Sequence, residues 1–91
     1  MRFEWDEAKR QANIRRHGFD FLLVETVFAG SVLTRLDDRF EYDEVRFITL
    51  GMLNGRVVAI AHTQTDEVTR IISARKASKN EEESYYQELA G

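Results

Sequence analysis

The sequence predicts a single α+β domain in which two N-terminal helices pack on an antiparallel β-sheet meander, with one further helix at the C-terminus. Three features predict this fold: a capped polar segment over 6–17, an Asn54-Gly55 pair between two β-rich runs, and a capping box over 78–81. The 91 residues are 43% hydrophobic. This length and composition suit one compact domain over 1–91 and not two.

Capping residues frame the first helix over 6–17. Asp6 suits the N-cap, and His17 followed by Gly18 suits the other end, where a basic residue and a glycine are favoured. The helix is mostly polar, and four of its side chains stack at helical spacing: Lys9, Asn13, Arg16 and His17. One face of this helix is therefore expected to be basic.

A second helix is predicted from Asp20, as N-cap, to Gly30, the glycine after its C-terminus. Its buried stripe comprises Phe21, Val24, Val27 and Phe28. From Ser31 the hydrophobic period changes to two, which predicts a strand that enters a polar stretch over 37–44.

The Asn54-Gly55 pair predicts a type I′ hairpin that joins strands over 46–53 and 56–63. A turn over 64–67 then returns the chain as a third strand over 68–75, which completes an antiparallel meander. The middle strand is apolar without alternation over 57–61, so we expect both of its faces to be covered.

The C-terminal helix opens with a capping box, Ser78 to Glu81, and then carries few apolar residues among its glutamates. Its apolar anchors are Tyr85, Tyr86 and Leu89. Because these anchors are few, we expect the helix to project from the body or to dock on a partner, and we take the three as partner-binding residues.

Several classes of function are excluded by composition. Without cysteine there is no disulfide, thiolate metal site or thiol nucleophile, and two histidines are too few for an imidazole zinc cluster. No cofactor is expected. No apolar run is long enough to span a membrane and the N-terminus is too polar for a secretory signal, so we expect a cytoplasmic protein. The acidic run over 37–44 suits a solvated loop, with magnesium binding as the alternative.

The net charge of −3 is unevenly distributed along the chain. Residues 1–18 carry five basic and three acidic residues, 19–45 two and seven, 46–76 five and two, and 77–91 one and four. A polyanion-binding surface would therefore combine the first segment with the third, which places the first helix and the last strand side by side in one basic groove. The alternative is that these are solvated charges on two separate elements.

Within that groove, Lys9 and His17 offer a phosphate contact and a candidate general acid or base, because histidine titrates near neutral pH. The alternative for His17 is a simple helix terminator, and His62 is expected to be a half-buried strand residue. Uninterrupted alternation from the hairpin places Arg46 and Arg75 on opposite faces of the sheet. Arginines at strand ends can also serve only as ion-pair partners of acids such as Glu44.

Two separated motifs resemble the BrnT family of toxins. The first is Phe3-Glu4-Trp5-Asp6-Glu7-Ala8-Lys9, followed by Asn13, Arg16-His17-Gly18 and Phe21. The second runs from Arg70 to Ala77, as Arg-Ile-Ile-Ser-Ala-Arg-Lys-Ala, ahead of a final helix that bears Glu and Tyr. Between them, Tyr42, Glu44, Arg46, Leu50-Gly51 and Gly55-Arg56 resemble the middle of the family.

The resemblance implies a RelE-like ribonuclease fold and a toxin that cleaves RNA and blocks translation. It also implies a BrnA-type ribbon-helix-helix antitoxin, expected as two toxins with an antitoxin dimer, and contact with operator DNA only through that antitoxin. Metal-free RNA cleavage needs cations for the phosphate and a proton carrier. By residue type, the candidate catalytic set is Lys9, His17, Arg46 and Arg75, and the candidate RNA-binding set is Arg16, Arg70 and Lys76.

A competing function is a catalytically weak protein-binding module that acts as antitoxin partner and transcriptional co-repressor. The isoelectric point near 5.4 favours this alternative, because a ribonuclease benefits from positive charge. Growth arrest on expression of the chain alone would favour the ribonuclease.

Overall fold

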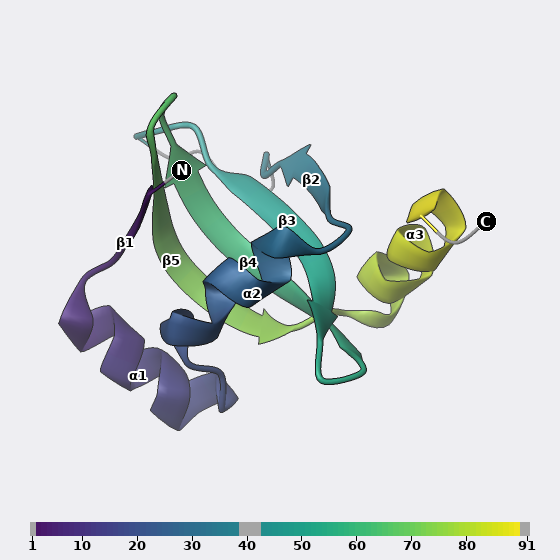
Figure 1. Ribbon diagram of the computed structural model, residues 1–91, viewed down its shortest axis with the longest axis horizontal. Helices are drawn as coiled ribbons and strands as arrows, with labels where there is room; N and C mark the ends of the chain where they lie inside the picture. The colour runs from purple at the N-terminus through teal and green to yellow at the C-terminus, as the bar shows by residue number, and fades with distance from the viewer. Residues whose placement is uncertain (1, 39–42, 90–91) are drawn as a thin grey trace.

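The computed structural model describes residues 2–38 and 43–89, which form three α-helices and one five-stranded mixed sheet (Figure 1). In chain order the elements are β1 (Arg2–Glu4), α1 (Glu7–His17), the 3₁₀ turn η1 (Phe21–Leu23), α2 (Val24–Ala29), β2 (Leu33–Leu36), β3 (Phe47–Leu53), β4 (Arg56–Gln64), β5 (Val68–Lys76) and α3 (Lys79–Leu89). The strand order is β1-β5-β4-β3-β2. The fold is therefore of the α+β class, as the sequence predicts.

Asp6 and Gly18 set the two ends of α1. The Asp6 side chain accepts hydrogen bonds from the backbone N–H groups of Ala8, at 2.8 Å, and Lys9, at 3.3 Å, which satisfies two donors of the first turn. Gly18 adopts a left-handed φ of 77°, and its N–H bonds to the carbonyl of Ile14. The predicted ends of this helix are confirmed.

A buried asparagine attaches α1 to the edge of β5. Nδ2 of Asn13 donates to the carbonyls of Phe19, at 2.8 Å, and Ala74, at 2.9 Å, while its Oδ1 accepts from the N–H of Ala74 at 3.1 Å. The amide offers Ala74 the donor and the acceptor that a neighbouring strand would offer, so it closes the sheet edge at that point. One side chain therefore fixes α1 against β5.

The second predicted helix is divided in the structure. The carboxylate of Asp20 accepts from the N–H of Leu22 at 3.0 Å and starts η1, after which α2 continues to Ala29. Gly30 follows in an extended conformation. The helix lies close on β3, because a Cβ on Gly51 would meet Cγ1 of Val27 at 2.5 Å, so only glycine permits this approach.

Strands β2 to β5 form the predicted antiparallel meander. Asn54 and Gly55 have φ values of 51° and 79°, which confirms the type I′ hairpin between β3 and β4. The expectation of an entirely antiparallel sheet is wrong, however, because β1 pairs in parallel with β5. The sequence over 2–4 is too short to show a strand period, so β1 was not predicted.

The pairing of β4 with β5 corrects the predicted faces of the sheet. The register shifts at Ala61/His62, and beyond this irregularity Arg75 pairs with Ala59. Arg75 therefore lies on the face of Ala59 and not, as uninterrupted alternation predicted, on the opposite one. Arg46, two residues before Ile48, belongs to this same face, because Ile48 pairs with Ala61.

The sheet has a core on each face, which explains why β4 does not alternate. One core is buried beneath η1 and α2 and consists of Phe21, Val24, Val27, Val58, Ile60, Ile71 and Ala74. The other lies on the face toward α3 and consists of Ile48, Leu50, Val57, Ala59, Ala77 and Tyr85. The prediction that both faces of the middle strand are covered is confirmed.

The expectation that α3 projects away from its own chain is wrong for its central residue. Tyr85 is 6% exposed, belongs to the second core, and donates a hydrogen bond from its hydroxyl to the carbonyl of Ser31 at 2.9 Å. Tyr85 thus packs α3 on the sheet, and α3 and α1 lie at opposite ends of the molecule (Figure 1). The small number of apolar residues in α3 did not predict this contact, because the contact depends on the position of one side chain, Tyr85.

Candidate nucleic-acid interface

A groove of about 220 Å³ lies between α1 and β5. Its walls are formed by Lys9, Ala12, Asn13, Arg16, His17, Ile72 and Ser73. The predicted neighbourhood of the first helix and the last strand is confirmed, and the contact that creates it is the attachment of Asn13 to Ala74. Three predicted site residues, Lys9, Arg16 and His17, therefore share one groove.

The chemistry of this groove suits a phosphodiester. Lys9 and Arg16 are exposed cations about two turns apart on α1, and half-buried His17 ends the helix. Ser73 adds a hydroxyl from the strand. Cationic donors can bind the phosphate oxygens, and an imidazole beside them can accept or donate a proton.

Arg10 lies on a different side of α1 and is engaged by carboxylates. Its Nε bonds to Oδ1 of Asp20 at 2.7 Å, and its Nη1 bonds to Oε2 of Glu7 at 2.7 Å. The Arg10 hydrogen bonds lower the pKa of Asp20 below its usual range. Arg10 thus fastens α1 to the start of η1, and the cations that line the groove are Lys9 and Arg16.

Arg75 does not line the groove and is held by α3. Its Nη1 and Nη2 atoms donate to the two carboxylate oxygens of Glu81 at 2.7 and 3.1 Å. Burial opposes ionisation of Glu81, but the bonds from Arg75 and from the backbone N–H of Ser78 outweigh it and lower the pKa of Glu81 to about 2. A phosphate would have to compete with this bidentate pair for the guanidinium.

The other sheet arginines lie toward the opposite end of β5. Arg70 forms an ion pair with Glu4 at 3.3 Å, and Arg46 forms one with Glu44 at 3.4 Å. Arg70 and Glu44 share a hollow of about 400 Å³ with Arg2. Ion pairing with acids, the alternative role expected for strand-end arginines, is thus present for both Arg46 and Arg70.

Arg46 and Arg75 share a face but not a site. Arg46 precedes Phe47, which pairs with His62, whereas Arg75 pairs with Ala59. Arg46 is therefore level with Thr63, four residues of β4 away from the level of Arg75, or about 13 Å along the strand. Lys76 is exposed at the end of β5 and, like Arg75, lies outside the groove.

His62 is fully buried and not half-buried as predicted. Its Nε2 shares a hydrogen bond with Oγ1 of Thr49 at 2.7 Å, and its ring lies against Phe28 and Phe47. Burial lowers the pKa of His62 to about 4. The imidazole is neutral near pH 7 and sealed in the core, so His17 is the histidine that a substrate can reach.

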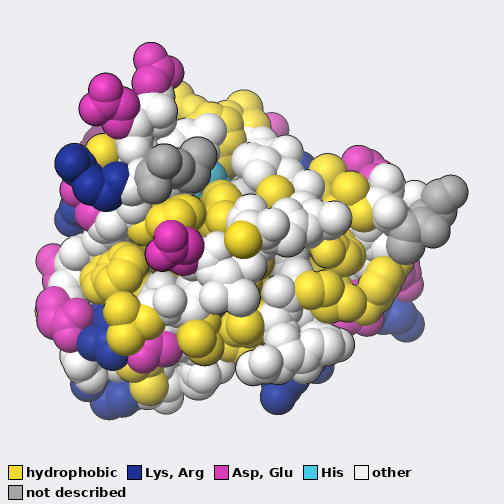
Figure 2. Space-filling model, viewed as in Figure 1, with side chains coloured by type: hydrophobic (Ala, Val, Ile, Leu, Met, Phe, Trp, Pro, Cys, Tyr) yellow, Lys and Arg dark blue, Asp and Glu magenta, His cyan; other side chains and the backbone are white. Residues whose placement is uncertain are grey.

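Two predicted partner-binding residues on α3 are accessible. Tyr86 is 41% exposed and Leu89 is 42% exposed, while Tyr85 is committed to the core. Figure 2 shows hydrophobic side chains over the middle of the viewed face and over α3, with Lys and Arg side chains toward its margins. Apolar and basic surfaces therefore occupy different parts of this face.

Sequence reasoning missed two contributors to these surfaces, Arg2 and the tethering role of Asn13. No signal in the sequence indicates that Asn13 is buried, because asparagine is mostly exposed and is ordinary on a polar helix face. Residues 39–42, which include Tyr42 and part of the acidic run, lie outside the described part of the chain. Within 2–38 and 43–89 no group of three potential metal ligands comes together, and no helix there is long and apolar enough to cross a membrane.

A small α+β fold with a cationic groove that ends at an accessible imidazole defines a class of protein equipped to hold an anionic chain. Comparison with known families gives a more specific result, because residues 5–81 match BrnT, the ribonuclease toxin of a type II toxin-antitoxin system. The chain belongs to this family. No curated protein matched it in a sequence search. The matched region includes both α1 and β5, and membership implies a ribonuclease toxin with an antitoxin partner.

Proposed function

We propose that the chain is a RelE-like, metal-independent endoribonuclease that inhibits translation, with its cleavage site in the groove between α1 and β5. The observation that carries the proposal is the presence of Lys9, Arg16 and His17 in one groove on a chain of a ribonuclease family. Lys9 and Arg16 bind the phosphate, and His17 carries the proton. This division of roles follows from residue type, because Lys and Arg are cations and an imidazole can accept or donate a proton.

The reaction proceeds by internal transfer at phosphorus. The 2′-oxygen of the ribose forms a bond to phosphorus as it loses its proton, and the bond from phosphorus to the 5′-oxygen breaks as that oxygen gains a proton. The products are a 2′,3′-cyclic phosphate and a 5′-hydroxyl. Lys9 and Arg16 stabilise the charge that develops on the phosphorane oxygens, and His17 takes part in the proton transfers.

The four remaining candidates contribute outside the reacting phosphate. Arg70 and Arg46 belong to the opposite end of the sheet and offer contacts to more distant phosphates of a bound strand. Lys76 offers such a contact at the end of β5. For Arg75 the bidentate pair with Glu81 supports a positioning role, in which it orients α3 against the sheet.

The antitoxin in this proposal is a BrnA-type ribbon-helix-helix protein, in an assembly of two toxins with an antitoxin dimer, and operator DNA is contacted only through it. Tyr86 and Leu89 on α3 provide the contact, since exposed aromatic and aliphatic side chains are favoured anchors in interface centres. The acidic surroundings of these anchors, with Glu82, Glu83 and Glu88 on the same helix, favour a basic partner surface.

The alternative function is a catalytically weak binding module that serves as antitoxin partner and co-repressor. The net charge of −3 and the paired state of Arg46, Arg70 and Arg75 favour it, because few cations remain for a polyanion. The two functions share the antitoxin and differ in whether RNA is cut.

Expression of the chain alone in bacteria, with RNA decay and growth followed together, separates the two. We expect growth arrest with loss of intact RNA, and recovery of growth with His17→Ala, because the proton carrier is removed. Lys79→Ala on α3 is the matched control and should leave the arrest intact. Cleavage by the purified protein should persist in a metal chelator. Undisturbed growth with intact RNA would support the binding module instead.

A further inference from the structure

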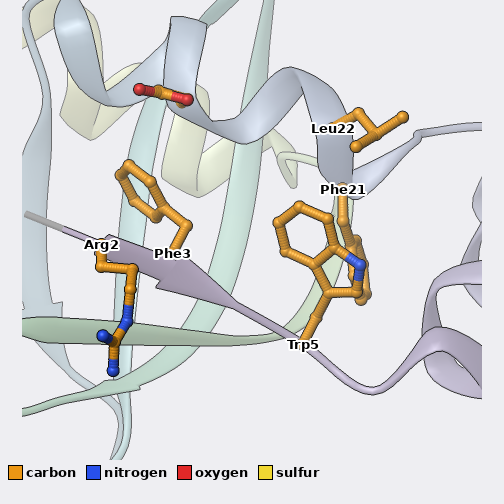
Figure 3. Close-up of a pocket in the computed structure, with 6 residues that line it drawn as sticks. Arg2, Phe3, Trp5, Phe21 and Leu22 are labelled. Atoms are coloured by element: carbon orange, nitrogen blue, oxygen red, sulfur yellow. The ribbon is translucent and has the colours of Figure 1, made fainter.

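A second hollow, of about 330 Å³, lies between β1 and the η1–α2 segment (Figure 3). It is lined by Arg2, Phe3, Trp5, Phe21, Leu22 and Glu25. The cleavage groove uses none of these residues. Leu22 is 58% exposed at its mouth, so the hollow opens to solvent. Its volume falls at the small end of the range for ligand pockets, which suits one ring system.

Two aromatic side chains of the N-terminal segment line the hollow. Phe3 lies on β1 and Trp5 follows the strand, and both side chains point to the same side of the chain (Figure 3). Aromatic side chains are the usual surfaces on which the bases of single-stranded RNA stack. A planar ring in the hollow can therefore contact both side chains.

Each wall is supported from behind. Phe3 packs on Phe28 with ring centroids 5.2 Å apart, and Trp5 meets the ring of Phe21 edge-on at 6.2 Å. Phe21 is fully buried in the core beneath η1 and α2. Supported rings keep their positions when the hollow is empty, so little ordering is needed when a ligand enters.

The polar groups of the hollow specify the kind of ring. Glu25 offers a carboxylate, which only accepts hydrogen bonds, so it favours a ring edge with two adjacent donors. Guanine presents N1–H and the N2 amino group side by side, whereas the other three bases place an acceptor next to their donor. Arg2 extends to the other side of β1, where it can meet a phosphate (Figure 3).

The hollow is close to the proposed cleavage groove along the chain. Trp5 lies just before α1, and Lys9 follows one helical turn later, about 6 Å along the axis. That distance corresponds to about two stacked nucleotides. The hollow lies on the η1 side of α1 and Lys9 on the β5 side, so a single strand that crosses the N-terminal end of α1 can reach both.

We propose that this hollow binds one guanine of single-stranded RNA, with the base against the rings of Phe3 and Trp5 and its donor edge on Glu25, and thereby sets where the RNA is cut. The proposal rests on the proposed ribonuclease function for its consequence, since a base held here fixes the position of the strand in the groove. Binding itself can be measured without any cleavage.

Trp5 is the single tryptophan of the sequence, so fluorescence excited selectively at tryptophan reports on this hollow. The His17→Ala protein, which keeps the hollow but does not cut, is titrated with the five-nucleotide RNAs UUGUU, UUAUU, UUCUU and UUUUU. We expect UUGUU to quench Trp5 and to bind about tenfold more tightly than the other three. Glu25→Ala should remove this preference while quenching persists, and Glu83→Ala on α3 should leave the preference unchanged.

Equal quenching by all four RNAs, or none by any, would overturn the proposal. A Trp5 signal that responds to the purified antitoxin but to no RNA would overturn it as well and assign the hollow to a protein contact. Cleavage mapping with the unmodified chain separates this proposal from the proposed function. If the RNA is cut without a preference for guanine, and Glu25→Ala does not change the cut positions, the guanine site is rejected while the ribonuclease function stands. If guanine binds but the RNA is not cut, the ribonuclease function is rejected while the guanine site stands.

Discussion

Helices α1 and α3 lie at opposite ends of the molecule and are attached to the sheet by different chemistry (Figure 1). Asn13 joins α1 to the edge of β5 through a buried amide, whereas Tyr85 joins α3 to a sheet face through an aromatic ring. An ion pair supports each attachment, Arg10 with Asp20 for α1 and Glu81 with Arg75 for α3. The exposed side chains on the other sides of each helix remain free for binding.

The surfaces left free differ in charge. The last turn of α1 is basic and opens into the groove with His17, while the first turn of α3 is acidic and its far end carries exposed Tyr86 and Leu89. A chain with a net charge of −3 can thus present a local cationic site. The separation is what lets one small protein hold RNA at one end and an antitoxin at the other in the function proposed above.

The largest effect on stability is expected from the α1 attachment. Asn13→Ala removes three hydrogen bonds and leaves buried backbone groups of Ala74 unpaired, which should lower the free energy of unfolding by about 3 kcal/mol. Urea denaturation measures this value. Asn80→Ala, at an exposed position on α3, is the control and should change it by less than about 0.5 kcal/mol. A small loss for Asn13→Ala would mean that other contacts hold α1.

The core beneath α2 should be sensitive to mild acid. Burial holds the pKa of His62 at about 4 in the folded chain, below its unfolded value near 6.5, so the unfolded state binds the proton more readily. The free energy of unfolding should therefore carry the full contribution of neutral His62 above pH 6.5. It should decrease as the pH falls toward 4, by up to about 3 kcal/mol. Denaturation at a series of pH values tests this. His62→Gln should flatten the curve in this window, and a wild-type curve that is already flat would contradict the account.

The α3 attachment should respond to stronger acid. Burial of Glu81 is outweighed by its bonds from Arg75 and Ser78, and its pKa is lowered to about 2, so it contributes stability above about pH 4.5 that is lost as the pH falls toward 2. Water screens this partly exposed pair, and Glu81→Gln should cost only about 1 kcal/mol at pH 7. Glu83→Gln is the matched control. Equal losses for the two variants would show that the pair does not hold α3.

The smallest effect on stability is expected in the groove itself. Lys9→Ala should leave the free energy of unfolding within about 0.5 kcal/mol of wild type, because the side chain is exposed. It should nevertheless reduce the salt dependence of RNA binding by one phosphate contact, a change of about 0.7 in the log–log slope. Lys79→Ala at the start of α3 should leave that slope unchanged. An unaltered slope for Lys9→Ala would place the RNA elsewhere.

Local signals predicted the elements well where they were strong. Asp6 and Gly18 gave the limits of α1, and Asn54-Gly55 gave the hairpin, because capping and turn chemistry depend on neighbouring residues only. Charge counted by segment predicted that α1 and β5 lie side by side, but the cations that line the groove come from α1 alone. Lys9, Arg16 and His17 share one helix, so the sequence could bring them together, whereas the basic residues of 46–76 lie outside the groove.

Features that depend on distant pairing could not be predicted. The irregularity at Ala61/His62 moved Arg75 to the other face, and nothing in the strand sequence marks it. The commitment of Arg75 to Glu81 and of Tyr85 to Ser31 likewise depends on where α3 docks. These contacts decide which arginines are available to a substrate. The candidate site residues chosen by residue type alone therefore included arginines that do not line the groove.

The most direct test of the central claim is the single-turnover rate of RNA cleavage by His17→Ala, compared with the unmodified chain in the presence of a metal chelator. The account predicts a rate lower by at least about 100-fold, the usual contribution of a general acid or base, with antitoxin binding unchanged because Tyr86 and Leu89 lie on α3 at the opposite end of the molecule. Cleavage by His17→Ala at the rate of the unmodified chain would contradict it.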